Sequence, residues 1–349
     1  MTARHAYLDW NATAPLRAEA RDAMIAACDI VGNPSSVHAA GRAARALVER
    51  SRAEIAEALG ASGADIVFTS GATEAAALAL HDRDIHAGAV EHDAVAAWVT
   101  ADLAVDGNGQ VTVDDPASSA VQRANSETGI LQDLPEGLFF CDAVQAIGKL
   151  PFAFAWSGAE MAAVSAHKFG GPKGIGALVL RQGRDVAATL RGGGQEQGRR
   201  SGTENVIGIA GFAAALKAAV AELESGAWEA VAERRDRMEA HLLDAASDLV
   251  IPGLDAPRLP NTSCLAVPGW KGETQVMQMD LAGYAISAGS ACSSGKVRES
   301  RVLAAMGFDK LISGGAIRVS MGTATTDAEV DGFASTWIEH YTRFRKRSA

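Results

Sequence analysis

Hydrophobic residues in the first half of the chain fall into short continuous runs that alternate with segments of helical spacing. The helical segments are 36–59 and 73–81, and the runs that predict strands are 65–70, 85–90, 120–125, 138–142, 161–165 and 176–181. Continuous hydrophobicity, in place of strict alternation, is typical of strands covered on both faces. The pattern therefore predicts an α/β layer built on a mostly parallel sheet.

After residue 205 the pattern changes to a long Ala-rich helical region, 206–248, which predicts a bridge between two domains. Short apolar segments beyond it predict strands at 261–267, 284–287 and 316–320. Helical spacing predicts covering helices at 273–281, 298–306 and 327–345. The C-terminal part is therefore predicted to be a smaller α+β domain.

Composition narrows the class of protein. The 349 residues are enough for a large core and two domains. The net charge is −10, which argues against a nucleic-acid partner, and basic residues cluster only in a tail predicted to be a solvated helix: Arg343, Arg345, Lys346 and Arg347. We expect neither secretion nor a membrane span, because the first ten residues lack an apolar signal core and no run approaches roughly 20 apolar residues.

The four cysteines are far apart and include no C-x-x-C pair, which argues against structural zinc and against a disulfide scaffold. A reduced, cytoplasmic protein fits this usage. Cys28, Cys141 and Cys264 have apolar neighbours typical of packed, inert thiols. Cys292 lies among small polar residues with basic residues nearby, which favours a mobile thiolate nucleophile.

Two segments that follow predicted strands suit a phosphorylated aromatic ring. Residues 68–74, FTSGATE, form a small-residue turn and a helix start whose N–H groups favour a phosphate; a plain helix cap at Thr73 is the alternative. Asp142 ends a strand where open α/β sheets bind ligands, and a carboxylate there can keep a pyridinium nitrogen protonated. An N-cap role is its alternative. Gln145 would donate to a phenolate oxygen.

Lys168 follows a predicted buried strand and precedes a glycine-rich turn, unlike most other lysines of the chain. A partly desolvated lysine beside cations has a lowered pKa and can form a Schiff base. Ser165 and His167 flank it with groups that bind phosphate. His92 also ends a strand, where it would stack on a flat ring and shuttle a proton, or serve only structurally.

Two further features have a functional and a structural interpretation. The polar, glycine-dense loop 192–205 is unusually long for a compact domain, and Thr203 with the loop arginines would reach a phosphate in the same subunit or across a dimer interface. Arg318 lies inside an apolar strand and requires a carboxylate partner, either a substrate or an internal ion pair.

In chain order, these motifs resemble the NifS/IscS-like cysteine desulfurases of bacterial iron–sulfur metabolism. That group belongs to the class-V aminotransferases, within the fold-type I pyridoxal-phosphate enzymes. The matching segments cover nearly the whole chain: 7–13, 32–38, 68–74, 91–95, 125–129, 142–145, 165–168, 192–205, 287–292 and the strand of Arg318. The resemblance implies a large cofactor domain, 12–224, with a mostly parallel seven-stranded sheet. It implies a small domain formed by 1–11 and 225–349.

The resemblance also implies a role for each matching residue. Lys168 would be the Schiff-base lysine, Asp142 the partner of the pyridine nitrogen, His92 the ring-stacking acid/base and Cys292 the nucleophile that attacks the substrate sulfur. Arg318 and Asn11 would bind the substrate. The remaining contacts to pyridoxal 5′-phosphate would come from Ala72, Thr73, Ser126, Gln145, Ser165, His167 and Thr203, the last donated by the second subunit of a homodimer.

The implied activity converts L-cysteine to L-alanine and passes the sulfur, as a persulfide, to a protein such as an iron–sulfur scaffold or carrier. A selenocysteine lyase or related β-eliminase is one alternative, and a weakly active structural or regulatory homologue is another. Two substitutions depart from the family, Ser126 for the usual Asn and Ala288 for a usual serine. The segments 81–120 and 129–139 are shorter than usual, the second too short for a helix.

Overall fold

A computed structural model describes residues 6–289 and 299–348 of the chain. Its helices are α1 (Ala18–Cys28), α2 (Ala39–Ala58), α3 (Ala72–Leu80), α4 (Asp93–Ala96), α5 (Val206–Glu224), α6 (Ala227–Ala245), α7 (Gly272–Leu281), α8 (Arg301–Ala305), α9 (Lys310–Ser313) and α10 (Asp327–Ser348). Its strands are β1 (Ala6–Tyr7), β2 (Asp65–Thr69), β3 (His86–Gly88), β4 (Thr100–Leu103), β5 (Ser119–Gln122), β6 (Leu138–Asp142), β7 (Ala159–Ser165), β8 (Gly176–Leu180), β9 (Thr262–Ala266), β10 (Tyr284–Ala285), β11 (Ser287–Ala288) and β12 (Ala316–Ser320).

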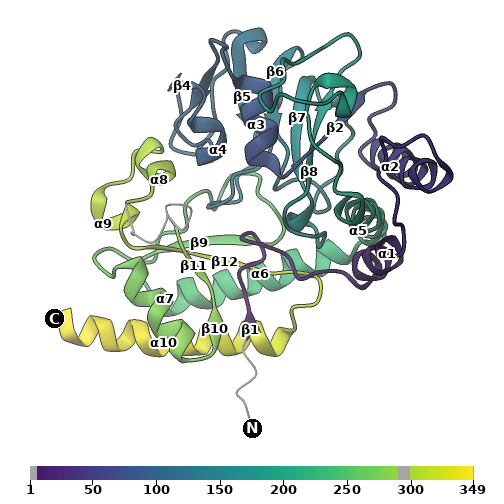
Figure 1. Ribbon diagram of the computed structural model, residues 1–349. Helices are drawn as coiled ribbons and strands as arrows, with labels where there is room; N and C mark the ends of the chain where they lie inside the picture. The colour runs from purple at the N-terminus through teal and green to yellow at the C-terminus, as the bar shows by residue number, and fades with distance from the viewer. Residues whose placement is uncertain (1–5, 290–298, 349) are drawn as a thin grey trace.

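The large sheet has seven strands in the order β2-β8-β7-β6-β5-β3-β4 (Figure 1). All neighbours are parallel except that β8 runs antiparallel to both β2 and β7. This confirms the predicted mostly parallel sheet. The pattern located six of the strands but not β4, whose residues are mostly exposed at the sheet edge and carry no apolar run.

Helices cover both faces of the large sheet, which explains its continuous hydrophobicity. Val48 and Ile55 of α2 and Phe212 of α5 pack on one face, against side chains such as Val164. Helix α3 packs on the other face, where Met161 belongs to its cluster. Neighbouring residues of β7 therefore point to opposite cores.

Helix α5 corrects the expectation that no segment is apolar enough to span a bilayer. Among the described residues it is the one helix that passes by length and mean hydropathy. Its apolar composition is explained by packing, because nine of its residues are buried, in contact with α1, α2 and the sheet.

The C-terminal part contains a smaller antiparallel sheet, β11-β12-β9, covered by α6, α7 and α10 (Figure 1). Ile317 and Val319 of β12 point into that core, together with Leu8 from the N-terminal segment. Strand β1 pairs in parallel with β10, so the N-terminal residues join this part of the molecule. The domain boundaries at residues 12 and 224 stay a prediction.

Three local expectations need correction. The helix predicted from residue 36 begins at Ala39, because the His38 side chain caps it by accepting the Gly41 N–H. The helical region 206–248 is two helices, α5 and α6, which Gly226 separates with a left-handed φ of 78°. Cys28, interpreted as a packed thiol, is exposed on α1, whereas Cys141 and Cys264 are buried as predicted. Residues 130–137 contain no helix, as their length predicts.

Candidate active site

A cavity of about 620 Å³ lies at the carboxyl ends of β6 and β7 and the start of α3. It brings together nine of the residues predicted from sequence to act on the cofactor or in catalysis: Ala72, Thr73, His92, Ser126, Asp142, Gln145, Ser165, His167 and Lys168. Ligand sites of open α/β sheets lie at this edge. A larger cavity, of about 690 Å³, is lined by charged residues of α2 and the loop near Glu196 and includes none of the predicted site residues.

The phosphate end of the cavity is formed by the turn that starts α3. Gly71 is the N-cap and adopts φ 156°, a conformation that favours glycine, and no side chain caps the helix there. The first backbone N–H groups of α3 are therefore available to an anion. Gly176 allows this turn to lie against β8, because a Cβ atom there would be 2.8 Å from Gly71 Cα. The capping alternative holds in part, since Glu74 accepts the Ser70 N–H.

His167 lies at the same end of the cavity among three lysines. Burial lowers the pKa of its imidazole to about 4, helped by the charges of Lys168, Lys173 and Lys149. Its Nδ1 atom is buried and has no hydrogen-bond partner among the described residues. A neutral imidazole in a lysine-rich cavity, with one nitrogen unsatisfied, matches the needs of a bound phosphate.

Asp142 ends β6 on the floor of the cavity and is buried. Its Oδ1 atom accepts the Val144 N–H at 2.9 Å, so the predicted local turn role is present. Burial raises the pKa of the carboxyl group, and the charges of His92 and Lys168 oppose this shift. A buried carboxylate of this kind is stabilised by a cation, such as a protonated ring nitrogen.

His92 is the N-cap of α4, and its Nδ1 atom accepts the Ala94 N–H at 3.1 Å. Nδ1 must therefore be unprotonated, and in the neutral ring the proton is on Nε2. The local bond fixes which nitrogen can exchange a proton. The structural and functional interpretations of His92 are thus compatible.

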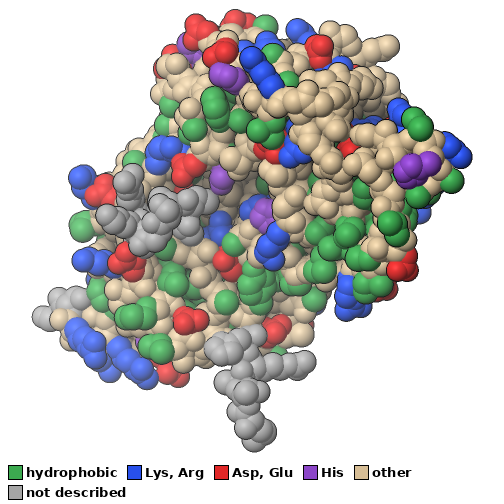
Figure 2. Space-filling view, viewed as in Figure 1, with side chains coloured by type: hydrophobic (Ala, Val, Ile, Leu, Met, Phe, Trp, Pro, Cys, Tyr) green, Lys and Arg blue, Asp and Glu red, His purple; other side chains and the backbone are tan. Residues whose placement is uncertain are grey.

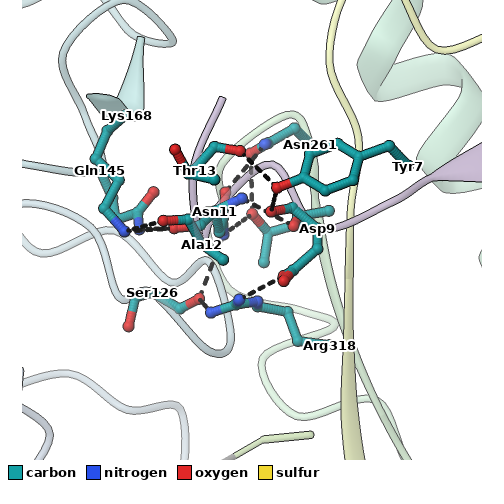
Figure 3. Close-up of polar contacts among 12 residues, drawn as sticks. Tyr7, Asp9, Asn11, Ala12, Thr13, Ser126, Gln145, Lys168, Asn261 and Arg318 are labelled. Atoms are coloured by element: carbon teal, nitrogen blue, oxygen red, sulfur yellow. Dashed lines mark hydrogen bonds and ion pairs between the residues drawn. The ribbon is translucent and has the colours of Figure 1, made fainter. Parts of the chain in front are cut away.

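Lys168 reaches across the cavity to the N-terminal segment (Figure 3). Its Nζ atom donates to the backbone oxygens of Asn11 at 2.6 Å and Ala12 at 3.0 Å. Gln145 Nε2 donates to the same Asn11 oxygen at 3.0 Å. The Asn11 side chain is turned away from the cavity, since it bonds to Lys149, Asn261, Thr262 and the Ser126 carbonyl. The backbone of Asn11, rather than its amide group, thus faces the lysine.

Arg318 lies on β12 on the opposite face from Ile317 and Val319. Its Nη2 atom donates to Asp9 Oδ1 at 2.7 Å and its Nη1 atom to the Ser126 carbonyl at 3.0 Å, as Figure 3 shows. The predicted internal ion pair is therefore present. The Nε atom is buried without a partner among the described residues, so one donor remains for a second carboxylate.

The remaining predicted residues lie elsewhere. Thr203 is exposed and lines a separate cavity of about 240 Å³ that shares Ser70 and Gly174 with the main one. The loop arginines do not line the main cavity, because Arg199 pairs with Asp65 and Asp185, and Arg200 pairs with Glu74. Cys292 lies outside the described residues.

Sequence reasoning missed three polar residues beside the cavity. Lys149 is buried and bonded to Gln145 and Asn11. Glu127 accepts a hydrogen bond from Ser300 at 2.5 Å, and burial raises the pKa of its carboxyl group to about 7. Asp9 holds Arg318. All three lie in or next to quoted motifs, so proximity to a motif was the only signal available.

The cavity residues fit pyridoxal phosphate. The open helix start and the unsatisfied His167 Nδ1 suit the phosphate group, and the buried Asp142 suits the ring nitrogen. Lys168 extends into the cavity between them.

Comparison with known proteins gives three consistent similarities. Residues 6–333 match the aminotransferase class-V family. A cysteine desulfurase of Cereibacter sphaeroides is 40% identical over 363 residues, which cover 93% of this chain and 92% of the relative. An IscS-like cysteine desulfurase of Mycobacterium tuberculosis is 36% identical over 370 residues, 93% of each protein. The solved NifS-like protein of Rickettsia africae is similar with a TM-score of 0.87 at 29% identity, covering 97% of this chain and 100% of that one.

Proposed function

The chain belongs to the class-V aminotransferase family and is a cysteine desulfurase, and we propose that Lys168 carries its pyridoxal phosphate and that Cys292 receives the sulfur. The observation that carries the assignment of residues is the convergence of nine predicted side chains on one cavity. Family members depend on this cofactor, and their substrate is L-cysteine.

When bound, pyridoxal phosphate supplies an electron sink for a carbanion at the substrate α-carbon. Asp142 holds the ring nitrogen protonated, and Gln145 donates to the phenolic oxygen. Ala72, Thr73, Ser165 and His167 hold the phosphate, with Thr203 of a second subunit. His92 packs on the ring and exchanges a proton at Nε2, because Nδ1 is engaged by the Ala94 N–H.

Substrate binding requires a cation for the α-carboxylate of cysteine. Arg318 is suited to this because Asp9 and the Ser126 carbonyl fix its guanidinium while Nε remains unsatisfied. A guanidinium held in this way loses little rotational freedom when the substrate binds. Asn11 contributes its backbone to this end of the site, and Ser126 contributes its carbonyl.

The sulfur step uses the Cys292 thiolate as nucleophile. It attacks the substrate sulfur, so that a sulfur–sulfur bond forms and the substrate carbon–sulfur bond breaks. The electron pair of that bond is protonated at carbon to give alanine, and Cys292 keeps a persulfide. A protein acceptor, such as an iron–sulfur scaffold or carrier, then removes the outer sulfur.

We also propose a cytoplasmic homodimer. Large apolar side chains gather on the surface of α1 and the segment after it, where Leu16, Ile25, Val31 and Val37 are exposed (Figure 2). Val31 is 94% exposed. Contiguous exposed apolar surface is typical of an interface between subunits.

The test is an absorption spectrum of the purified protein, reconstituted with pyridoxal phosphate, before and after addition of cysteine. We expect a visible band that changes on addition, with alanine and sulfide formed in parallel. In Lys168→Ala the covalent band should be absent, whereas Lys217→Ala on the exposed side of α5 should behave as wild type. In Cys292→Ser the band should still respond to cysteine, but sulfur release should be lost.

Three results would count against the assignment. A protein that stays colourless would reject Lys168 as the cofactor lysine, and undiminished sulfur release by Cys292→Ser would reject Cys292. Turnover of selenocysteine with almost no turnover of cysteine would favour the lyase alternative instead. Alanine formation by the isolated protein would exclude a purely structural homologue.

A further inference from the structure

Lys149 is a buried lysine behind the active-site cavity, four residues after Gln145. Its Nζ atom is 2.6 Å from Gln145 Oε1 and 3.0 Å from Asn11 Oδ1. Both contacts are to amide oxygens, and no ion pair with a carboxylate of the described residues is present. Burying an ammonium group without a counter-charge is costly, so its position requires an explanation beyond packing.

The two contacts fix the direction of the Gln145 amide. Lys149 does not line the main cavity, whereas Gln145 does, so the Lys149 contact draws Oε1 away from the cavity. Nε2 then donates one N–H to the Asn11 carbonyl at 3.0 Å. An amide nitrogen carries two N–H groups, and the second is left for an acceptor in the cavity.

We propose that Lys149 is a positioning residue, which holds the Gln145 amide with its N–H donor, rather than its oxygen, toward the cofactor ring. The inference rests on the proposed function, in which Gln145 faces the phenolic oxygen of pyridoxal phosphate. A flipped amide would place a carbonyl oxygen against that oxygen, and two acceptors repel.

The protonation of Lys149 agrees with this role. Burial lowers the pKa of its amine well below the usual value, and the charges of Lys168 and Arg318 lower it further. A neutral amine still carries two N–H groups, which equals the number of acceptors that it meets. Lys149 also shares Asn11 with the catalytic site, since Lys168 donates to the backbone oxygen of the same residue.

The test compares Lys149→Met with wild type, both loaded with pyridoxal phosphate, by titrating the visible absorption band with pH in the absence of substrate. Loss of the oriented donor should shift the titration midpoint of the band by about half a unit to one unit, as expected for one hydrogen bond. Gln145→Leu should shift it in the same direction. The matched control Lys217→Met removes an exposed lysine of α5 and should leave the midpoint in place.

A double-mutant cycle separates positioning from general damage. If Lys149 acts through Gln145, adding Lys149→Met to Gln145→Leu should produce no further shift. Additive shifts, or an unmoved midpoint in Lys149→Met, would overturn the proposal. Lys149→Gln, which keeps an amide donor, should restore part of the wild-type midpoint and provides a second variant if the methionine variant is not folded. A wild-type protein without any visible band would instead reject the proposed function, so the two failures are distinguishable.

Discussion

Arg318 combines an internal ion pair with an unsatisfied donor, so its geometry can be tested by a change that keeps the charge. Lysine has one compact ammonium group and cannot contact Asp9, the Ser126 carbonyl and a substrate carboxylate together. We expect Arg318→Lys to lower kcat/KM for cysteine about 10–100-fold, mainly through KM, while the visible band of the cofactor is unchanged. Steady-state alanine formation measures this. Arg343→Lys on α10, an exposed arginine, is the matched control.

An unchanged KM in Arg318→Lys would mean that the substrate carboxylate is bound by another group. A lost visible band would mean instead that Arg318 supports the cofactor site as a whole. Asp9→Asn offers a second approach, since the arginine would keep its charge but lose its ion pair.

Glu127 should make the stability of the protein depend on pH. Burial raises the pKa of its carboxyl group from 4.5 to about 7, against the opposing contributions of Ser300, Arg318 and Arg301, while Asp93 raises it slightly. Between these two pH values the folded state binds the proton more tightly than the unfolded state. The contribution of Glu127 to stability is therefore fully present below pH 4.5 and is lost as pH rises through 7.

We expect Glu127→Gln to gain stability relative to wild type as pH rises from 5 to 7.5, by at most about 3 kcal/mol. Urea unfolding of both proteins at the two pH values measures the difference. Glu57→Gln on the exposed side of α2 should show no such trend. A difference between Glu127→Gln and wild type that is independent of pH would contradict the assigned shift.

The sequence predicted the cavity residues because each follows a strand or a small-residue turn, and the carboxyl ends of parallel strands meet at one edge. It did not predict Lys149 or Glu127. A lysine after glycine and a glutamate in a polar turn have the local appearance of surface residues, and their burial results from contacts with Asn11 and Ser300, far away in sequence. Roles that depend on distant partners leave no mark in local patterns.

Among the elements, the long polar loop is held by one buried glutamate. Glu196, in the short 3₁₀ helix Gln195–Gly198, has a left-handed φ of 48° and binds Arg52 of α2 through both oxygens, at 2.8 and 2.9 Å. It also accepts the Phe68 N–H of β2 at 2.9 Å. The loop is therefore fixed to both α2 and the large sheet.

We expect Glu196→Ala to lower the free energy of unfolding by about 2–3 kcal/mol, less than for a fully enclosed pair because Arg52 keeps some solvent contact. Urea unfolding measures the change. Glu49→Ala removes an exposed carboxylate that pairs with the same arginine and should cost no more than about 1 kcal/mol. Equal effects of the two substitutions would show that the loop does not depend on its buried anchor.

Element prediction succeeded where burial was symmetrical and failed at edges and caps. Strand β6 was located residue for residue because every one of its side chains is buried. Strand β4 has a polar, exposed face and a single neighbour, β3, so the hydrophobic pattern gave no signal. The start of α2 depended on a histidine cap, which is a weak signal because Ser, Thr, Asp and Asn are the usual caps.

At the level of the whole molecule, the main cavity is incomplete with respect to one predicted contact. Thr203 of the same chain lines the neighbouring small cavity, while exposed apolar residues of α1 and the segment after it offer a surface for a second subunit. In a dimer with twofold symmetry, each subunit would donate Thr203 to the phosphate site of the other. The site would then consist of Lys168 from one chain and Thr203 from its partner.

Mixed dimers test this arrangement directly. We expect Lys168→Ala and Thr203→Ala homodimers each to be impaired in alanine formation. After unfolding and refolding together in equal amounts, half of the dimers should be mixed, and each mixed dimer should contain one intact site made from both chains. Activity should therefore recover to about a quarter of wild type. If Thr203 acted within its own chain, no mixed dimer would contain an intact site and activity would stay at the average of the two variants. Because both arms use the same two proteins, the recovered fraction decides between the two arrangements.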